Sequence, residues 1–266
     1  MLRKLTRWWR RSADSDAGRS ERFQADPATL QYRHGTSWVT NGEADPSVSA
    51  GQLYAFKDSA SFMDLIGRAM PELYRVRLDD STTAYEAFMN YLERVGKPGE
   101  QPGDFFRTMR AMLMLYTDDR FFRILNGAWR GNRSGEYLGI SSLLVTAFEH
   151  APYFIEGEVY RGVNLPDVSN YAEGLVFRWP FFFSASTERG VATQFGKTLF
   201  VIEVPADGNV RAIWSCSLLP DEREVLFHPY EVFEVLSAGP TEVRVRISRD
   251  IYFGMDEFEI GENREV

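Results

Sequence analysis

Hydrophobic side chains recur every three or four residues from about residue 54 onward, the spacing that places them on one face of an α-helix. The first such stretch carries Phe62, Leu65, Ile66, Ala69 and Leu73. Four more stretches follow before residue 150. The pattern therefore predicts five helices in succession, in the first half of the chain.

Turn and capping residues mark the limits of these helices. Thr83 and Glu86 have the spacing of a capping box, in which each side chain satisfies a free backbone amide of the other's residue. Residues 97–103 are rich in Pro and Gly and end the second helix, and Thr117 starts the fourth. The apolar positions of the second to fifth helices are Phe88, Met89, Leu92 and Val95; Phe105, Met109, Met112, Leu113 and Tyr116; Phe121, Leu125, Ala128 and Trp129; and Tyr137, Ile140, Leu144 and Phe148.

After about residue 156 the apolar residues alternate or form short solid runs, which is typical of β-strands. The predicted strands are 158–161, 179–184, 199–204, 210–214, 222–228, 232–236 and 243–247. Helices that precede strands, instead of alternating with them, predict an α+β fold. The chain has neither G-x-G-x-x-G after a strand nor G-x-x-x-x-G-K-[ST], so neither common phosphate-binding loop is expected.

These patterns divide the chain into four parts. Residues 1–50 are expected to be a flexible basic leader, because Ser, Asp, Gly and Pro are frequent there and no period is sustained. A helical lobe is expected over 51–155, a β-rich catalytic core over 156–248 and an acidic tail over 249–266. The middle two parts are expected to form one compact domain.

Charge and cysteine content narrow the classes of function. The formal net charge is −8, yet residues 1–23 contain seven Arg or Lys and three acidic residues. An acidic body argues against broad binding of nucleic acid through its phosphates. The single cysteine, Cys216, favours a reducing compartment, or secretion by a route that bypasses oxidative folding. The three histidines lie far apart in the chain, so no metal site is predicted. No run of about 20 apolar residues predicts a membrane span.

The first of three chemically suggestive clusters is Val159-Tyr160-Arg161-Gly162. An arginine at a strand end in an apolar segment needs an anionic partner, and its planar guanidinium suits phosphate. The glycine after it lets a flat ligand approach the backbone. The alternative is a structural arginine, ion-paired at a turn.

The second cluster runs from Phe182 to Arg189, where an aromatic strand ends in Ser184, Ala185, Ser186 and Thr187. A short helix is expected to follow, with Ser186 or Thr187 as its cap and its N-terminus available for phosphate. A plain N-cap without a ligand is the alternative.

The third cluster is Glu222-Arg223-Glu224. In a strand, Glu222 and Glu224 would share one surface, with Arg223 on the other. Adjacent like charges are not stabilising, but a cleft can use one carboxylate to stabilise a sugar cation and another to polarise a nucleophile. The alternative is a solvated acidic edge strand.

Arginine, then serine, then Glu-x-Glu, in that order across one β region, resembles the arginine–serine–glutamate class of mono-ADP-ribosyltransferases, and most of all its arginine-directed vertebrate-type and bacterial members. The resemblance covers roughly residues 105–237. It includes the three clusters, Ala192-Thr193-Gln194-Phe195-Gly196, Pro220-Asp221 before Glu222, and Tyr116-Thr117 followed by Leu125-Asn126. It implies a core of two packed, mainly antiparallel sheets around an NAD cleft, with NAD as co-substrate.

The resemblance also implies roles for individual residues. Arg161 would hold the NAD phosphates, and the Gly162 backbone the nicotinamide amide. Ser184 would orient Glu224, which would bond the ribose 2′-hydroxyl and stabilise the cationic transition state. Glu222 would engage the acceptor, and residues 215–221 would form the acceptor-recognition loop. The remaining expected NAD contacts are Tyr160, Phe183, Ser186 and Arg189.

The expected function is transfer of ADP-ribose to a macromolecular acceptor, most simply a protein arginine. Nucleic-acid modification and NAD hydrolysis are the alternatives. In the sequence, Ala185 is the middle residue of Ser-x-Ser, and the disulfides and export signal of the vertebrate enzymes have no counterpart. A cytoplasmic enzyme, or a toxin or effector delivered into a target cell, is therefore expected. An antitoxin or immunity protein is a candidate partner that the sequence leaves open.

Overall fold

The structure is a computed structural model that describes residues 31–33, 36–39, 62–96, 104–130, 133–151, 153–165, 168–169, 171–179 and 181–248. The acidic tail 249–266 and most of the leader 1–50 lie outside the described residues. Two short strands, β1 (Gln31–Arg33) and β2 (Thr36–Val39), fall inside the leader segment, where no element was expected.

The five predicted helices are confirmed. They are α3 (Phe62–Arg75), α4 (Ala84–Val95), α5 (Asp104–Tyr116), α6 (Asp119–Arg130) and α7 (Leu138–Glu149), with a 3-10 turn η2 (Ser134–Tyr137) before the last. Thr83 caps α4, and Glu86 completes the predicted capping box. None of the helices in the described part of the chain is long and apolar enough to cross a membrane.

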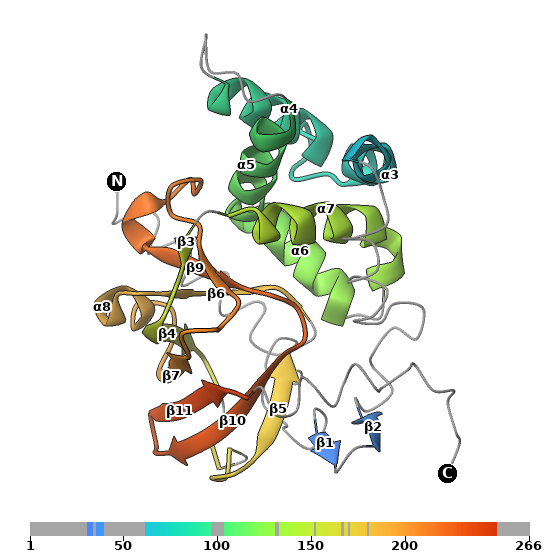
Figure 1. The fold of residues 1–266 in the computed structure, drawn as a ribbon. Coiled ribbons are helices and arrows are strands. Elements are labelled where there is room, and N and C mark those ends of the chain that lie inside the picture. The colour runs from blue at the N-terminus through green and yellow to red at the C-terminus, as the bar shows by residue number, and fades with distance from the viewer. Residues whose placement is uncertain are drawn as a thin grey trace.

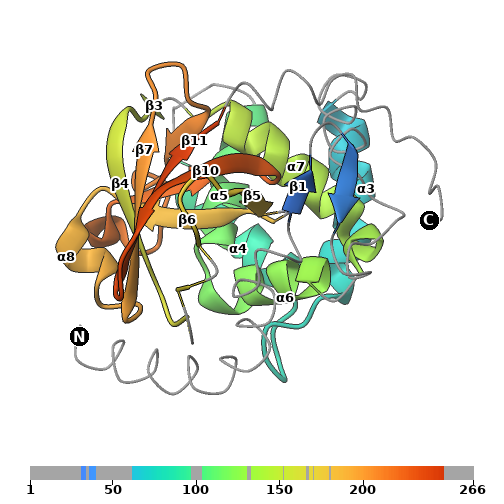
Figure 2. The same cartoon turned by 90° about the horizontal axis from the view of Figure 1, so that it is seen from below.

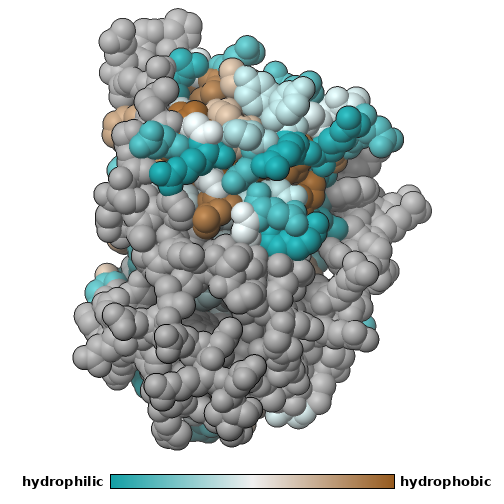
Figure 3. All heavy atoms as spheres, turned by 90° about the vertical axis from the view of Figure 1, so that its right-hand side faces the viewer, coloured by the Kyte–Doolittle hydropathy of each residue, from teal (hydrophilic) through white to brown (hydrophobic). Residues whose placement is uncertain are grey.

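Helix α7 is the centre of the helical half. Its residues 139–148 are all buried, because it packs against both α3 and α5. Such a helix must also satisfy its polar side chains internally. Ser142 and Thr146 donate to carbonyls one turn back, and Ser141 accepts from Trp129 Nε1 at 3.3 Å. On the face shown in Figure 3, the coloured, described residues are mostly hydrophilic, with apolar side chains in small groups, as amphipathic helices require.

The second half of the chain is built of strands. They are β3 (Tyr153–Phe154), β4 (Gly157–Val163), β5 (Val176–Trp179), β6 (Phe183–Ser186), β7 (Thr198–Val204), β8 (Val210–Ala212), β9 (Glu224–Phe227), β10 (Glu231–Ala238) and β11 (Glu242–Ile247). A one-turn helix α8 (Arg189–Ala192) follows β6, and a 3-10 turn η3 (Pro220–Glu222) precedes β9. The predicted α+β class is confirmed.

The strands form one curled, continuous sheet in the order β2-β1-β5-β10-β11-β7-β4-β6-β9-β8-β3 (Figures 1 and 2). The pairing is antiparallel except between β11 and β7. The expected antiparallel character is confirmed, whereas the division into two separate sheets is not, because neighbouring strands are hydrogen bonded throughout.

The single strand predicted over 179–184 is wrong. Trp179 ends β5, which pairs with β10, and Phe183 begins β6, which pairs with β4 and β9. The two strands therefore lie at separate places in the sheet. Pro180, between them in the sequence, has no amide hydrogen to give to a ladder.

The helical half and the sheet share one hydrophobic core. Tyr116 Oη and Asn126 Nδ2 both donate to the Phe182 carbonyl oxygen, at 3.1 and 3.0 Å, so α5 and α6 are attached to the chain just ahead of β6. Beneath them Phe183 stacks on Phe227 with ring centroids 4.3 Å apart. These contacts fix the ends of β6 and β9 against the helices, where the candidate site lies.

Candidate active site

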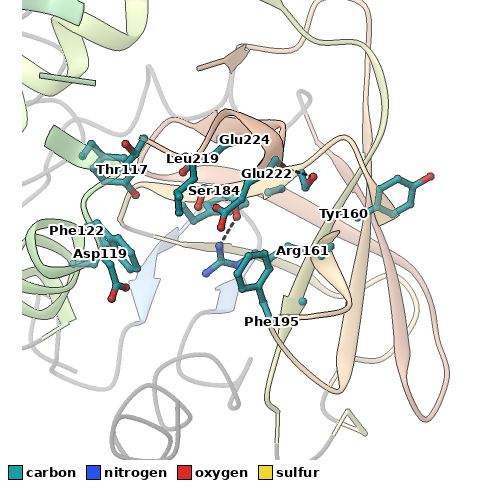
Figure 4. A pocket seen from close by; sticks show the side chains of 17 residues that line it. Thr117, Asp119, Phe122, Tyr160, Arg161, Ser184, Phe195, Leu219, Glu222 and Glu224 are labelled. Carbon is teal, nitrogen blue, oxygen red and sulfur yellow. Dashed lines mark hydrogen bonds between the residues drawn. The ribbon is translucent and has the colours of Figure 1, made fainter. Parts of the chain in front are cut away.

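A cleft with a volume of about 170 Å³ opens between the helical half and the sheet (Figure 4). Its lining residues are Tyr116, Thr117, Asp119, Phe122 and Asn126 from the helical side, and Tyr160, Arg161, Gly162, Phe183, Ser184, Ala185, Ser186, Ala192, Phe195, Leu219, Glu222 and Glu224 from the sheet and its loops. The structure thus brings Arg161, Ser184, Glu222 and Glu224 together, although they are far apart in the sequence.

Arg161 lies inside β4, two residues before its end, and not at the strand terminus as expected. Its Nη1 donates to the Ser184 carbonyl oxygen, the dashed line in Figure 4. The guanidinium also lies near the rings of Trp179 and Phe183, with its central carbon 5.9 and 5.4 Å from their centroids. Aromatic faces and a carbonyl therefore orient this cation toward the cleft.

Ser184 and Ser186 are on β6, which pairs with β9 so that Ser186 is opposite Glu224. The Ser184 hydroxyl hydrogen bonds to the Glu224 carboxyl. Ser186 donates to the Glu222 carbonyl at 2.7 Å and accepts from the Glu188 amide at 3.0 Å. One serine thus orients the carboxyl of Glu224 and the other holds the backbone of Glu222.

The expected helix cap at Ser186 or Thr187 is wrong. Helix α8 begins after Glu188, and no side chain caps it. Ser186 is used instead to join the start of this turn to Glu222, because β6 runs alongside the Glu-x-Glu segment.

Glu222 and Glu224 do not lie in one strand, which corrects the prediction. Pro220 starts the turn η3 that ends at Glu222, Arg223 adopts a left-handed conformation with φ 49°, and Glu224 begins β9. A left-handed residue with a Cβ costs about 1 kcal/mol or more. The Arg223 carbonyl accepts from the Thr187 amide at 3.2 Å, which helps to hold this conformation. Both carboxyls still line the cleft.

The electrostatics of the two carboxyls are unusual. Burial, with the nearby Asp119 charge, raises the pKa of Glu222 to about 7. Burial, with the charge of Glu222, raises the pKa of Glu224 to about 8, although Ser184, Ser217 and Arg161 act to lower it. Both carboxyls resist ionisation in the free protein. Such groups are suited to a site that binds a cationic ligand or in which positive charge develops in the transition state.

The raised pKa values predict a pH dependence of stability. Between an unfolded-state pKa of 4.5 and the folded values of about 7 and 8, the folded protein binds more protons than the unfolded one. Stability from these two groups is therefore present at low pH and lost as the pH rises through 7 to 8. Urea unfolding at pH 6 and pH 8.5 measures this effect. Between these two pH values, the free energy of unfolding should fall by roughly 1 to 3 kcal/mol more in the native protein than in a Glu222→Gln/Glu224→Gln variant. Equal losses would contradict the burial of these carboxyls.

Three other residues that were expected to contact NAD make protein contacts in the structure. The Gly162 backbone does line the cleft, but a Cβ there would lie 2.0 Å from the Ala192 carbonyl oxygen, so close packing against α8 already requires glycine. Tyr160 turns its ring away from the cleft (Figure 4), and its hydroxyl bonds to Glu158. Arg189 pairs with Glu242 at 2.6 Å and does not line the cleft.

The sequence analysis did not assign Thr117, Asp119, Phe122 or Phe195 to the site. The first three come from the α5–α6 junction and face the sheet across the cleft (Figure 4). The sequence feature that pointed to these three residues was the stretch from Tyr116-Thr117 to Asn126. It is part of the family resemblance, but no role was predicted for it. Within the described ranges, no three His, Cys, Asp or Glu side chains gather as a metal site.

Comparison with known families and structures gives one consistent result. The family model for NAD:arginine ADP-ribosyltransferase matches residues 68–251. The mouse (Mus musculus) GPI-linked NAD(P)(+)–arginine ADP-ribosyltransferase 1 is 33% identical over 99 residues, which are 34% of this chain and 27% of that protein. The Bos taurus ecto-ADP-ribosyltransferase 5 is 38% identical over 79 residues, 29% of this chain and 24% of that protein. Each match thus spans about a quarter of the curated relative.

Solved structures share the fold. The eukaryotic mono-ADP-ribosyltransferase ART2.2, in a mutant form bound to NADH, superposes with a TM-score of 0.55 at 21% identity and covers 71% of this chain and 88% of its own. The type III effector XopAI of Xanthomonas axonopodis pv. citri gives a TM-score of 0.55 at 17% identity, covering 74% of this chain and 92% of its own.

Proposed function

Since this chain belongs to the NAD:arginine ADP-ribosyltransferase family, whose model matches residues 68–251, we propose that it is a mono-ADP-ribosyltransferase that uses NAD to modify an arginine of a protein. The observation that carries this proposal is the meeting of Arg161, Ser184, Glu222 and Glu224 in one cleft. The acceptor is a macromolecule, and modification of nucleic acid is an outcome of the test below.

The residues present fit NAD. Arg161 supplies a cation, held on aromatic rings, for the phosphates, since a guanidinium matches phosphate oxygens in geometry and charge. Phe195 offers apolar surface in the cleft for the flat nicotinamide, whereas Phe183, 1% exposed, supports the cleft wall from beneath. The Gly162 backbone lies at the cleft wall, within reach of an amide group. In this arrangement the ribose between phosphate and nicotinamide lies beside Glu224.

The chemistry follows from where charge develops. The bond between nicotinamide nitrogen and ribose C1′ breaks, nicotinamide leaves as a neutral molecule with the bonding electrons, and positive charge develops on the ribose. Glu224, as a carboxylate, accepts a hydrogen bond from the 2′-hydroxyl and stabilises that charge. A fixed carboxylate contributes most in the transition state, because the ground state of the ribose is neutral.

Glu222 acts on the acceptor. A guanidinium nitrogen attacks C1′ only when it can give up a proton, and a carboxylate with a pKa near 7 is suited to receive that proton at neutral pH. The acceptor nitrogen then forms the new bond to C1′ as the nicotinamide leaves. The proposed acceptor loop, residues 215–221, immediately precedes Glu222.

The test is incubation of the purified protein with labelled NAD in two separate reactions. One contains a cell lysate, and the other contains agmatine as a minimal guanidine acceptor. Label that survives nuclease but not protease, and ADP-ribosyl-agmatine in the second reaction, would support the proposal. Nuclease-sensitive label would instead show a nucleic-acid acceptor, and free ADP-ribose alone would show a glycohydrolase. Absence of all four products would refute the proposal.

The cellular setting is also proposed. The single cysteine, Cys216, is buried and free, which favours a reducing compartment. We propose action in a cytoplasm, either of the producing cell or of a target cell, as a toxin or effector. An antitoxin or immunity protein is then the partner to be sought by co-purification with the catalytically inactive protein.

A further inference from the structure

The proposed acceptor loop, residues 215–221, is attached to the helical half by a side chain that the chemistry above leaves unused. Thr117 follows the end of α5, and its hydroxyl donates to the Met114 carbonyl at 2.8 Å. The same oxygen accepts a hydrogen bond from the Leu218 backbone amide at 3.0 Å, across 101 residues of sequence. Figure 4 shows Thr117 and Leu219 on the same side of the cleft. One hydroxyl therefore uses both its donor and its acceptor capacity to join helix and loop.

Next to this anchor, the Ser217 hydroxyl links the loop to Glu224. It donates to Glu224 Oε2 at 3.5 Å and accepts from the Leu219 amide at 3.0 Å. The distance to Glu224 is at the long limit for a hydrogen bond, so this contact can tighten when the carboxyl ionises. The loop is thus attached to α5 at Leu218 and to the carboxyl of Glu224 at Ser217.

The loop then runs without a gap into Glu222. The Glu222 amide donates to the Leu219 carbonyl at 3.0 Å, and Arg223 to that of Pro220 at 3.2 Å. A shift at Leu218 is therefore passed through this short, hydrogen-bonded turn to the Glu222 side chain. The position of Glu224 depends less on the loop, because β9 is paired with both β6 and β8.

On the premise of the proposed function, we propose that Thr117 and Ser217 are positioning residues that hold the acceptor loop so that Glu222 faces the reacting ribose, and that they thereby set how much ADP-ribose reaches arginine and how much is lost to water. Neither needs to touch the acceptor. Thr117 acts through Leu218, and Ser217 acts through Glu224.

The experiment compares Thr117→Val, which keeps the shape of the side chain, with Thr117→Ser, which keeps the hydroxyl. With NAD and agmatine, the ratio of ADP-ribosyl-agmatine to free ADP-ribose should fall about tenfold in Thr117→Val, since a directional hydrogen bond to a partly buried amide is lost. Thr117→Ser should restore the ratio to within about twofold, as the same bond is retained.

A matched control is Thr146→Val. Thr146 also donates to a helix carbonyl, that of Ser142 at 2.9 Å, but it is buried in α7 and does not line the cleft. This variant should leave the ratio unchanged even where it lowers the melting temperature. An unchanged ratio in folded Thr117→Val, or the same fall in Thr146→Val or Thr117→Ser, would overturn the proposal.

Ser217→Ala gives an independent readout. The Ser217 hydroxyl acts to lower the pKa of Glu224, so its removal should move the acidic limb of the pH profile of NAD cleavage to higher pH. An unmoved limb would remove Ser217 from the proposal. If the native protein formed neither ADP-ribosyl-agmatine nor ADP-ribose, the proposed function would fail; if it formed both and the variants did not change their ratio, only this inference would fail.

Discussion

Glutamine in place of Glu224 is expected to abolish both ADP-ribosyl transfer and NAD hydrolysis, with a loss of kcat of about 10³-fold or more. The amide keeps the size of the side chain and its bond to Ser184, but it carries no charge to stabilise the cationic ribose. Because the loss arises in the transition state, the KM for NAD should change far less than kcat. The measurement is nicotinamide release under saturating NAD, with and without agmatine.

The same substitution should stabilise the fold. Glu224 is a partly buried carboxyl whose pKa is raised to about 8, so keeping its charge above that pH costs folding free energy. The neutral variant avoids this cost, and its melting temperature at pH 8.5 should be higher than that of the native protein. Glu173→Gln, at an exposed position outside the cleft, is the matched control and should alter neither activity nor melting temperature. Substantial NAD cleavage by Glu224→Gln would refute the assigned role.

Glutamine in place of Glu222 is expected to separate the two reactions. Transfer to agmatine should fall about 10²- to 10³-fold, the usual effect of losing a general base, because the attacking guanidinium can no longer pass its proton to a carboxylate. NAD hydrolysis should persist at a measurable rate, since water is small and Glu224 remains in place. Simultaneous assay of ADP-ribosyl-agmatine and free ADP-ribose by chromatography measures both.

Two outcomes would contradict this role of Glu222. Equal loss of both products would mean that Glu222 acts on NAD itself, together with Glu224. Unchanged transfer would mean that the acceptor is deprotonated elsewhere, with Asp119 as the next carboxyl in the cleft. A third readout is the pH profile of transfer, whose limb near pH 7 should disappear in Glu222→Gln if that limb reports the Glu222 carboxyl.

The helices were the most predictable part of the fold. Their apolar spacing and the capping box of Thr83 and Glu86 are local features, and the energy that forms them involves residues three or four apart. The strands were less predictable, because the pairing between strands decides where each one begins and ends. Trp179 and Phe183 read as one run, yet they belong to strands with different neighbours. Nothing within the run itself specifies those partners.

The candidate site was predictable in its chemistry and less so in its geometry. The order of Arg161, Ser184 and Glu224 carried a family resemblance that implied one cleft, and all three residues line it. The left-handed Arg223, which takes Glu222 out of the strand, was not foreseen, since only Asn, Asp and Gly commonly signal such a conformation. Arg189 looked equally available for a phosphate, and its partner Glu242 lies 53 residues away.

By itself, the sequence determined the class of fold, the order of its elements and the kinds of charge that the cleft contains. These depend on residue chemistry and on interactions over a few positions, which a linear pattern records. Only the tertiary structure decided which groups meet, such as Thr117 with Leu218 and Ser217 with Glu224. It also decided that the two cleft carboxyls are partly buried, which raises their pKa values. Such contacts join segments up to 101 residues apart, and their energies depend on burial and direction, which exist only once the chain has folded.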